Sequence, residues 1–166
     1  MYTKLVTQIL AGLFVKSAVK HVIDNGVRDN VIEPAIGSIV YCEIGLGLAE
    51  HSGVYIGNGE IIHLNGKGYI ERVSPQAFIE DTTALSIYVG CNGRYPSGCT
   101  SVADKAIEYE RHISTMNYNI MLSNCHQFTT ACINHNLENS STFLWMLKDV
   151  CEKELAIDNW RVWKTP

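Results

Sequence analysis

The chain has 166 residues, of which 46% are hydrophobic and 18% charged, and its formal net charge is −4. This length and composition fit a globular protein and exclude a disordered chain. The acidic balance and the lack of a Lys/Arg stripe argue against a nucleic-acid-binding protein. We therefore expect a single domain, residues 1–166; the sequence leaves its oligomeric state open.

Six cysteines occur in the chain, an even number that would allow complete pairing. The chain is longer than most disulfide-stapled secreted domains, and no secretory signal is recognised. Free thiols in a reduced, cytoplasmic protein are therefore the preferred interpretation. Cys91 and Cys99 flank a turn-rich loop and are the one pair whose spacing suits a bridge, although free thiols are preferred for them as well.

Residues 3–24 are predicted to form an amphipathic helix packed on the domain, because Leu5, Ile9 and Leu13 recur at helical spacing. The apolar run is shorter than the ~20 residues that cross a bilayer. Lysines flank the run, so a peripheral membrane contact through this helix is the alternative.

Short β-prone segments follow, joined by turns that favour antiparallel pairing. They span residues 38–43, 51–56, 60–64, 68–73 and 84–89. Gly57-Asn58-Gly59 has the composition of a tight hairpin turn, because Asn and Gly tolerate positive φ. With Asn58 at the centre, the numbers of facing residues sum to about 116. This register places His51 and His63 at the same end of the hairpin and on one face of the sheet.

Helical segments are expected after the strands. The capping-box pattern from Ser101 to Asp104 predicts a helix that runs to about His112. A second helix is predicted to begin near Cys125, and a charged periodic stretch predicts a C-terminal helical segment within 141–163. The predicted fold class is α+β, with an antiparallel sheet packed against helices.

Cys125 is the candidate nucleophile. Asn124 before it is a good N-cap, and Gln127 completes a capping-box pattern, so the thiol is predicted at the first turn of a helix. The unpaired N–H groups and the helix dipole favour a thiolate there and could stabilise an oxyanion. Most free cysteines are simply small buried residues, so this segment alone does not establish catalysis.

His51 and His63 supply two imidazoles to accompany the thiol. One imidazole can accept the thiol proton while the other fixes its tautomer. A lone histidine on a strand is usually a structural polar residue, so the pair is the informative feature. The rival interpretation is a zinc site that adds Cys125 and His126, although no standard ligand spacing supports it.

These segments resemble one family. The stretch from His51 to Leu64 resembles the paired-histidine hairpin of lecithin:retinol acyltransferase-like (LRAT-like) proteins, and the stretch from Tyr118 to Phe128 resembles their Asn-Cys-Glu-His-Phe motif. Residues 37–40 resemble the strand that opens the family's domain. Order and spacing agree over roughly residues 35–136. The family belongs to the circularly permuted NlpC/P60 branch of the papain-like superfamily, in which the histidines precede the cysteine.

The resemblance implies a permuted NlpC/P60 fold and a thiol-dependent acyltransferase or hydrolase that works without a cofactor or metal. Cys125 would carry an acyl-thioester, His51 would be the general base, and His63 the third member of the triad. Asn124 and Tyr55 would support them. The substrate would be a lipid ester or an amide such as a cell-wall peptide. The alternative is a non-catalytic binding module with the same fold.

Two departures from the family pattern affect the site. His126-Gln127 stands where better-known animal members have Glu-His, which removes a carboxylate next to the nucleophile. The tail is charged where those members often end in a hydrophobic anchor, so a membrane-lipid substrate does not follow from the resemblance.

Overall fold

The computed structural model describes residues 31–45, 48–80, 82–116 and 124–163. The helix expected at 3–24 and the part of the cysteine motif before Asn124 lie outside these residues. None of the helices in the described part of the chain combines the length and hydropathy that crossing a bilayer requires.

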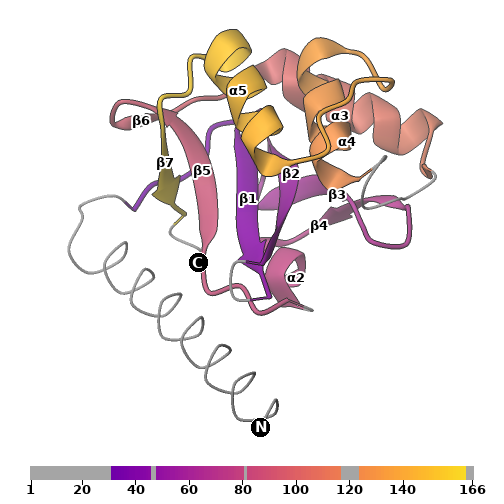
Figure 1. The fold of residues 1–166 in the computed structure, drawn as a ribbon, viewed down its shortest axis with the longest axis horizontal. Coiled ribbons are helices and arrows are strands. Elements are labelled where there is room, and N and C mark those ends of the chain that lie inside the picture. The colour runs from indigo at the N-terminus through magenta and orange to yellow at the C-terminus, as the bar shows by residue number, and fades with distance from the viewer. Residues whose placement is uncertain (1–30, 46–47, 81, 117–123, 164–166) are drawn as a thin grey trace, which may run out of the picture.

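A seven-stranded sheet forms the centre of the described structure (Figure 1). The strands are β1 (Ile39–Ile44), β2 (Ala49–Gly57), β3 (Glu60–Leu64), β4 (Ile70–Val73), β5 (Ile87–Asn92), β6 (Tyr95–Pro96) and β7 (Asn159–Val162). Their order is β4-β3-β2-β1-β5-β6, and β7 also pairs with β5. Each of these strand pairs is antiparallel.

Helices accompany the sheet, which confirms the predicted α+β class. They are α2 (Pro75–Glu80), α3 (Thr100–His112), α4 (Cys125–Asn134) and α5 (Leu144–Leu155). Figure 1 shows α3, α4 and α5 together on one side of the sheet and α2 apart from them. The strands are buried on both faces because alternate residues enter two apolar clusters: Ile62 packs with Phe128 of α4, whereas Ile61 packs with Phe78 of α2.

The β2–β3 hairpin has the register predicted from its turn. Val54 pairs with Ile62 and Tyr55 with Ile61. Asn58 adopts a φ of 53°, as a left-handed turn residue does. A bulge between Tyr55 and Gly57 accommodates the turn and leaves the pairing beyond it unshifted.

Two helical predictions need correction. Helix α3 begins at Thr100, after an N-cap at Cys99 that makes no side-chain hydrogen bond, so the capping box predicted from Ser101 is not used. The segment 141–163 is helical only over Leu144–Leu155, because Ala156 adopts a left-handed φ of 53° and ends the helix. The residues after it instead form β7, where Val162 pairs with Tyr88.

All six cysteines are free thiols, including Cys91 and Cys99. Five of them are buried, and Cys99 is half-exposed. Burial, and not pairing, is therefore what most of these side chains contribute to the fold.

Candidate active site

Asn124 caps α4 and places Cys125 at its first position. The side-chain oxygen of Asn124 accepts hydrogen bonds from the N–H groups of His126, at 2.9 Å, and Gln127, at 3.3 Å. The predicted N-cap is thus confirmed. Gln127 does not complete a capping box, because its amide donates to the carbonyl of Asn139 at 2.6 Å.

The amide of Asn124 has a second partner. Its Nδ2 donates to the carbonyl oxygen of Thr142 at 2.7 Å. The segment before α5, which continues into Phe143, is therefore tied to the beginning of α4. Both Thr142 and Phe143 line the pocket that contains Cys125.

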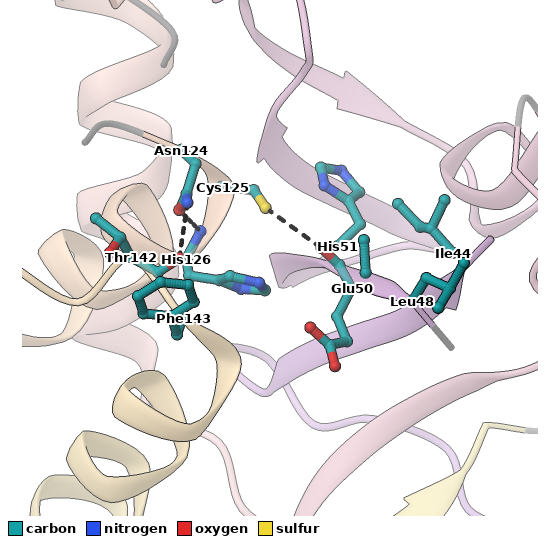
Figure 2. Close-up of a pocket in the computed structure, with 10 residues that line it drawn as sticks. Ile44, Leu48, Glu50, His51, Asn124, Cys125, His126, Thr142 and Phe143 are labelled. Atoms are coloured by element: carbon teal, nitrogen blue, oxygen red, sulfur yellow. Dashed lines mark hydrogen bonds between the residues drawn. The ribbon is translucent and has the colours of Figure 1, made fainter. Parts of the chain in front are cut away.

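The Cys125 thiol is buried against the beginning of β2. The residue is 3% exposed, and its Sγ lies 4.0 Å from the carbonyl oxygen of Glu50 (Figure 2). Burial raises the pKa of the thiol to about 11 and outweighs the hydrogen-bond donors of Ser52 and His126, which lower it. Cys125 is therefore a neutral thiol at pH 7, unlike the thiolate expected from its place at a helix N-terminus.

His51 and His63 meet on the face of the sheet that carries α2. Nε2 of His51 lies 2.6 Å from Nδ1 of His63, and the rings cross at 83°. The ring centroid of Phe78 lies 4.9 Å from that of His51 and 5.4 Å from that of His63. Helix α2, which the sequence analysis did not anticipate, thus packs Phe78 against both imidazoles.

Gly53 lies tightly against β3. A Cβ at this position would lie 2.8 Å from Cγ2 of Ile61, 2.9 Å from the carbonyl oxygen of Ile62 and 3.2 Å from the Cβ of His63. Gly53 follows His51 by two residues and so lies on the same face of β2. The space that a side chain would fill lies beside the His51–His63 contact.

Glu71 extends the histidine pair. It lies opposite His63 in the β3–β4 pairing, with Oε1 3.3 Å from Nε2 of His63. The contact has the length of an ion pair without the alignment of a regular hydrogen bond. Asn65 donates to the same oxygen at 2.9 Å and fixes its position. Sequence analysis missed Glu71; the register of the β3–β4 hairpin would have been the signal.

The proton order along this chain follows from Glu71. A carboxylate only accepts, so we assign the His63 proton to Nε2, which leaves Nδ1 unprotonated. His51 must then donate from Nε2 across the 2.6 Å contact. A neutral His51 arranged in this way carries its lone pair on Nδ1, the nitrogen that a base would use.

Both imidazoles are neutral at pH 7. Burial, helped by the nearby His63 and His126, lowers the pKa of His51 well below its ordinary value. Burial also lowers the pKa of His63 to about 4, although the Glu71 carboxylate acts in the opposite direction. The resting site therefore combines a neutral thiol with neutral imidazoles.

Cys125 and His51 both line a pocket of about 430 Å³. Its lining consists of Ile44, Leu48, Ala49, Glu50, His51, Asn124, Cys125, His126, Thr142 and Phe143 (Figure 2). A second pocket of about 420 Å³ contains His63 and Glu71 and shares Ile44 and His51 with the first. Ile44 and His51 thus lie between the two pockets. Within the described residues the thiol makes no hydrogen bond to His51.

Tyr55 lies apart from this group. Its hydroxyl accepts a hydrogen bond from the N–H of Gly59 at 3.3 Å, and its ring meets Trp163 edge-on at 5.1 Å. Tyr55 is four residues beyond His51, about 13 Å along an extended strand. Of the two supporting residues predicted from sequence, Asn124 lines the pocket and Tyr55 does not.

The described residues contain no group of three His, Cys, Asp or Glu side chains spaced to hold a metal ion. His51 and His63 face each other at hydrogen-bonding distance, so their nitrogens share a proton and do not converge on an empty point. This arrangement differs from the zinc site that the residue types alone allow.

Comparison of the chain with known protein families, with curated proteins and with solved structures found no match. The side chains in and next to the pocket are a buried thiol, neutral imidazoles and, behind them, the Glu71 carboxylate.

Proposed function

We propose that the protein is a thiol-dependent acyltransferase or hydrolase of the LRAT-like type, with a permuted NlpC/P60 (papain-like) fold. Cys125 is the nucleophile, His51 the general base and His63 the third member of the triad. The observation that carries the proposal is the 2.6 Å contact between His51 and His63, made by a histidine that also lines the Cys125 pocket. The chain order, with both histidines before the cysteine, also agrees with a permuted papain-like fold.

In the first half-reaction, Sγ of Cys125 attacks the substrate carbonyl and its proton passes to Nδ1 of His51. Because burial favours the neutral forms of both groups, this proton transfer accompanies attack instead of preceding it. Nδ1 of His63 accepts a hydrogen bond from the Nε2–H of His51 and so stabilises the His51 imidazolium, and the Glu71 carboxylate lies behind His63. The leaving group then takes the proton from His51, and the acyl group remains on Cys125 as a thioester.

The developing oxyanion needs a donor at the beginning of α4. The N–H groups of His126 and Gln127 are already engaged by the Asn124 cap. The N–H of Cys125 is the remaining donor of this turn and is the group we assign to the oxyanion. The cap thus narrows the oxyanion site that sequence analysis predicted for the whole turn.

The substrate is a lipid ester or an amide, and the lining of the pocket favours an apolar acyl group. Ile44, Leu48 and Phe143 line the pocket around Cys125, and Leu48 is 71% exposed. Apolar side chains at the mouth of such a pocket contribute about 25 cal/mol for each Å² of apolar surface that a ligand covers.

Mass spectrometry of the intact protein tests the proposal. The protein is incubated in parallel with a p-nitrophenyl ester, a short-chain phosphatidylcholine and a peptidoglycan stem peptide. We expect at least one of these compounds to form an acyl adduct that maps to Cys125. The compound that reacts will show whether the substrate is a lipid ester or a peptide amide. Cys125→Ala should lose the adduct, whereas Cys99→Ser, the matched control, should keep it. A wild-type protein that forms no adduct on Cys125 with any acyl donor would leave only the non-catalytic binding module.

A further inference from the structure

A second imidazole enters the Cys125 pocket. His126 follows the nucleophile in α4, is 4% exposed and belongs to the pocket lining. Figure 2 shows its ring reaching from α4 toward Glu50, across the space beside Cys125. The triad proposed above consists of Cys125, His51 and His63, and the His126 ring has no part in it.

The hydrogen bonds around His126 define its tautomer. Thr129 Oγ1 donates to the carbonyl of Cys125 at 2.8 Å, because a carbonyl only accepts. Thr129 has no second proton, so it cannot donate to Ser52 Oγ, which lies 3.1 Å away. The single proton of the Ser52 hydroxyl is taken by Thr129 or by the neighbouring Cys125 sulfur. In both cases Ser52 is the acceptor in its 2.8 Å contact with Nδ1 of His126, so the His126 proton is on Nδ1.

The other nitrogen of His126 therefore carries a lone pair. Within the described residues Nε2 has no hydrogen-bond partner, and it is not among the buried polar atoms that lack one, so it reaches the open space of the pocket. Burial, and after it the positive charge of Lys148, lowers the pKa of His126 to about 4. The ring is consequently a neutral hydrogen-bond acceptor at pH 7.

We propose that His126 is the base of the second half-reaction, which activates the hydroxyl, amine or water that removes the acyl group from Cys125. This inference rests on the function proposed above. The acceptor gives its proton to Nε2 of His126 while its oxygen or nitrogen bonds to the thioester carbon. The C–S bond then breaks with its electron pair on Sγ. The imidazolium releases its proton to solvent, from which the thiolate of Cys125 is reprotonated.

The two half-reactions thereby use imidazoles from different elements. His51 comes from β2 and takes the proton of the thiol, whereas His126 comes from α4 and takes the proton of the second substrate. The position that carries Glu in better-known members of the LRAT-like family carries this imidazole here. Because neutral His126 can only accept a proton at Nε2, it favours a second substrate that has one to give, namely an O–H or N–H nucleophile.

His126→Asn is the test variant, because the Asn amide can replace Nδ1 as a donor to Ser52 while nothing replaces Nε2. With a p-nitrophenyl ester, we expect the burst of p-nitrophenol, which reports acylation, to keep its wild-type rate. The steady-state rate should fall by about 100-fold, as for loss of a general base, and the acyl-enzyme should accumulate in intact mass spectra. Hydroxylamine needs no base at neutral pH and should discharge the variant and the wild type equally fast.

The outcomes separate this inference from the proposed function. If the wild type acylates and turns over, and His126→Asn deacylates at the wild-type rate, His126 is not the base. Equal losses of burst and steady-state rates would assign it a structural role and also overturn the proposal. If the Asn variant does not fold, His126→Ala gives the comparison, because it too leaves nothing in place of Nε2. Failure of the wild type to acylate at all would instead refute the triad.

Discussion

Glu71 and His63 face each other across the β3–β4 pair, with Oε1 and Nε2 3.3 Å apart. The proposed triad has an imidazole where many papain-like enzymes have Asn or Asp, and this carboxylate would restore a negative charge one position farther from the thiol. In that proposal Glu71 is a positioning residue, which favours one tautomer of His63 and, through it, of His51.

Glu71→Gln should lower kcat/KM by about 10- to 100-fold, because the amide can present either a donor or an acceptor to His63 and no longer selects one tautomer. The loss should be smaller than that for a buried triad carboxylate, because the Glu71 side chain is 42% exposed. The matched control is Glu60→Gln, whose carboxylate is similarly exposed and binds Arg72. Equal activity of the two variants would remove Glu71 from the site.

The acid limb of the rate profile should lie below pH 6.5. His51 works as a base only when neutral, and burial lowers its pKa well below that value. As the pH falls, His51 therefore becomes protonated only at a pH below the range in which an ordinary histidine takes up its proton. We expect kcat/KM to stay level from pH 7.5 to 6.5 and to fall at lower pH; a half-maximal rate above pH 6.5 would contradict a buried, neutral base.

Stability should also decline on acidification. His63 and His126 have folded-state pKa values of about 4, below the 6.5 of an unfolded histidine. The unfolded chain therefore binds more protons than the folded one as pH falls from 6.5 toward 4, and each histidine removes up to about 3 kcal/mol over this range. Urea titrations at successive pH values measure this loss, and His126→Asn should flatten the dependence. A constant urea midpoint would show that the imidazoles are charged or exposed in the folded protein.

Cys99, and not Cys125, should react first with iodoacetamide in the absence of substrate. The helix N-terminus alone would make Cys125 the fastest thiol, but burial raises its pKa to about 11. Cys99 is half-exposed, and the Ser101 hydroxyl, 3.1 Å from its sulfur, lowers its pKa. Peptide mapping after brief labelling gives the order. In a Cys99→Ser background, an activated ester should still acylate Cys125, and adding His51→Ala should abolish this.

Gly53→Ala should damage the site more than the fold. The added methyl would meet Cγ2 of Ile61, the Ile62 carbonyl oxygen and the Cβ of His63, so β2 and β3 would have to shift at the point where they carry His51 and His63. Overpacking of this kind costs about 1–3 kcal/mol of stability, and we expect kcat/KM to fall by at least about 10-fold, as for a weakened base. Gly66→Ala is the control, because a Cβ there meets nothing within 4 Å. An active Gly53→Ala enzyme would show that the His51–His63 contact is dispensable.

Local chemistry made much of this site predictable. The turn composition around Asn58 predicts the pairing of Val54 with Ile62, and Asn124 predicts the beginning of α4; the structure has both. Both signals act within a few residues, where backbone geometry and side-chain capping decide the structure.

Other features depended on contacts that a linear pattern does not contain. Ser74 caps α2 before Pro75, with Oγ accepting from the N–H of Ala77 at 3.2 Å, so a local signal existed there but the helix was too short to show periodicity. The protonation of Cys125 depends on burial against β2, far away in sequence. The pairing of β7 with β5 likewise joins distant segments, and the charged composition before β7 gave no sign of it.

The amide of Asn124 makes two structural contacts at once. Its oxygen caps the helix that begins with Cys125, and its nitrogen holds the Thr142–Phe143 wall of the pocket. One planar amide thus sets both the position of the Cys125 sulfur and the shape of the pocket wall. A substitution that widens the pocket at this wall will also move the sulfur. In the proposed enzyme a new substrate specificity is therefore easier to reach at the opposite wall, at Ile44 and Leu48.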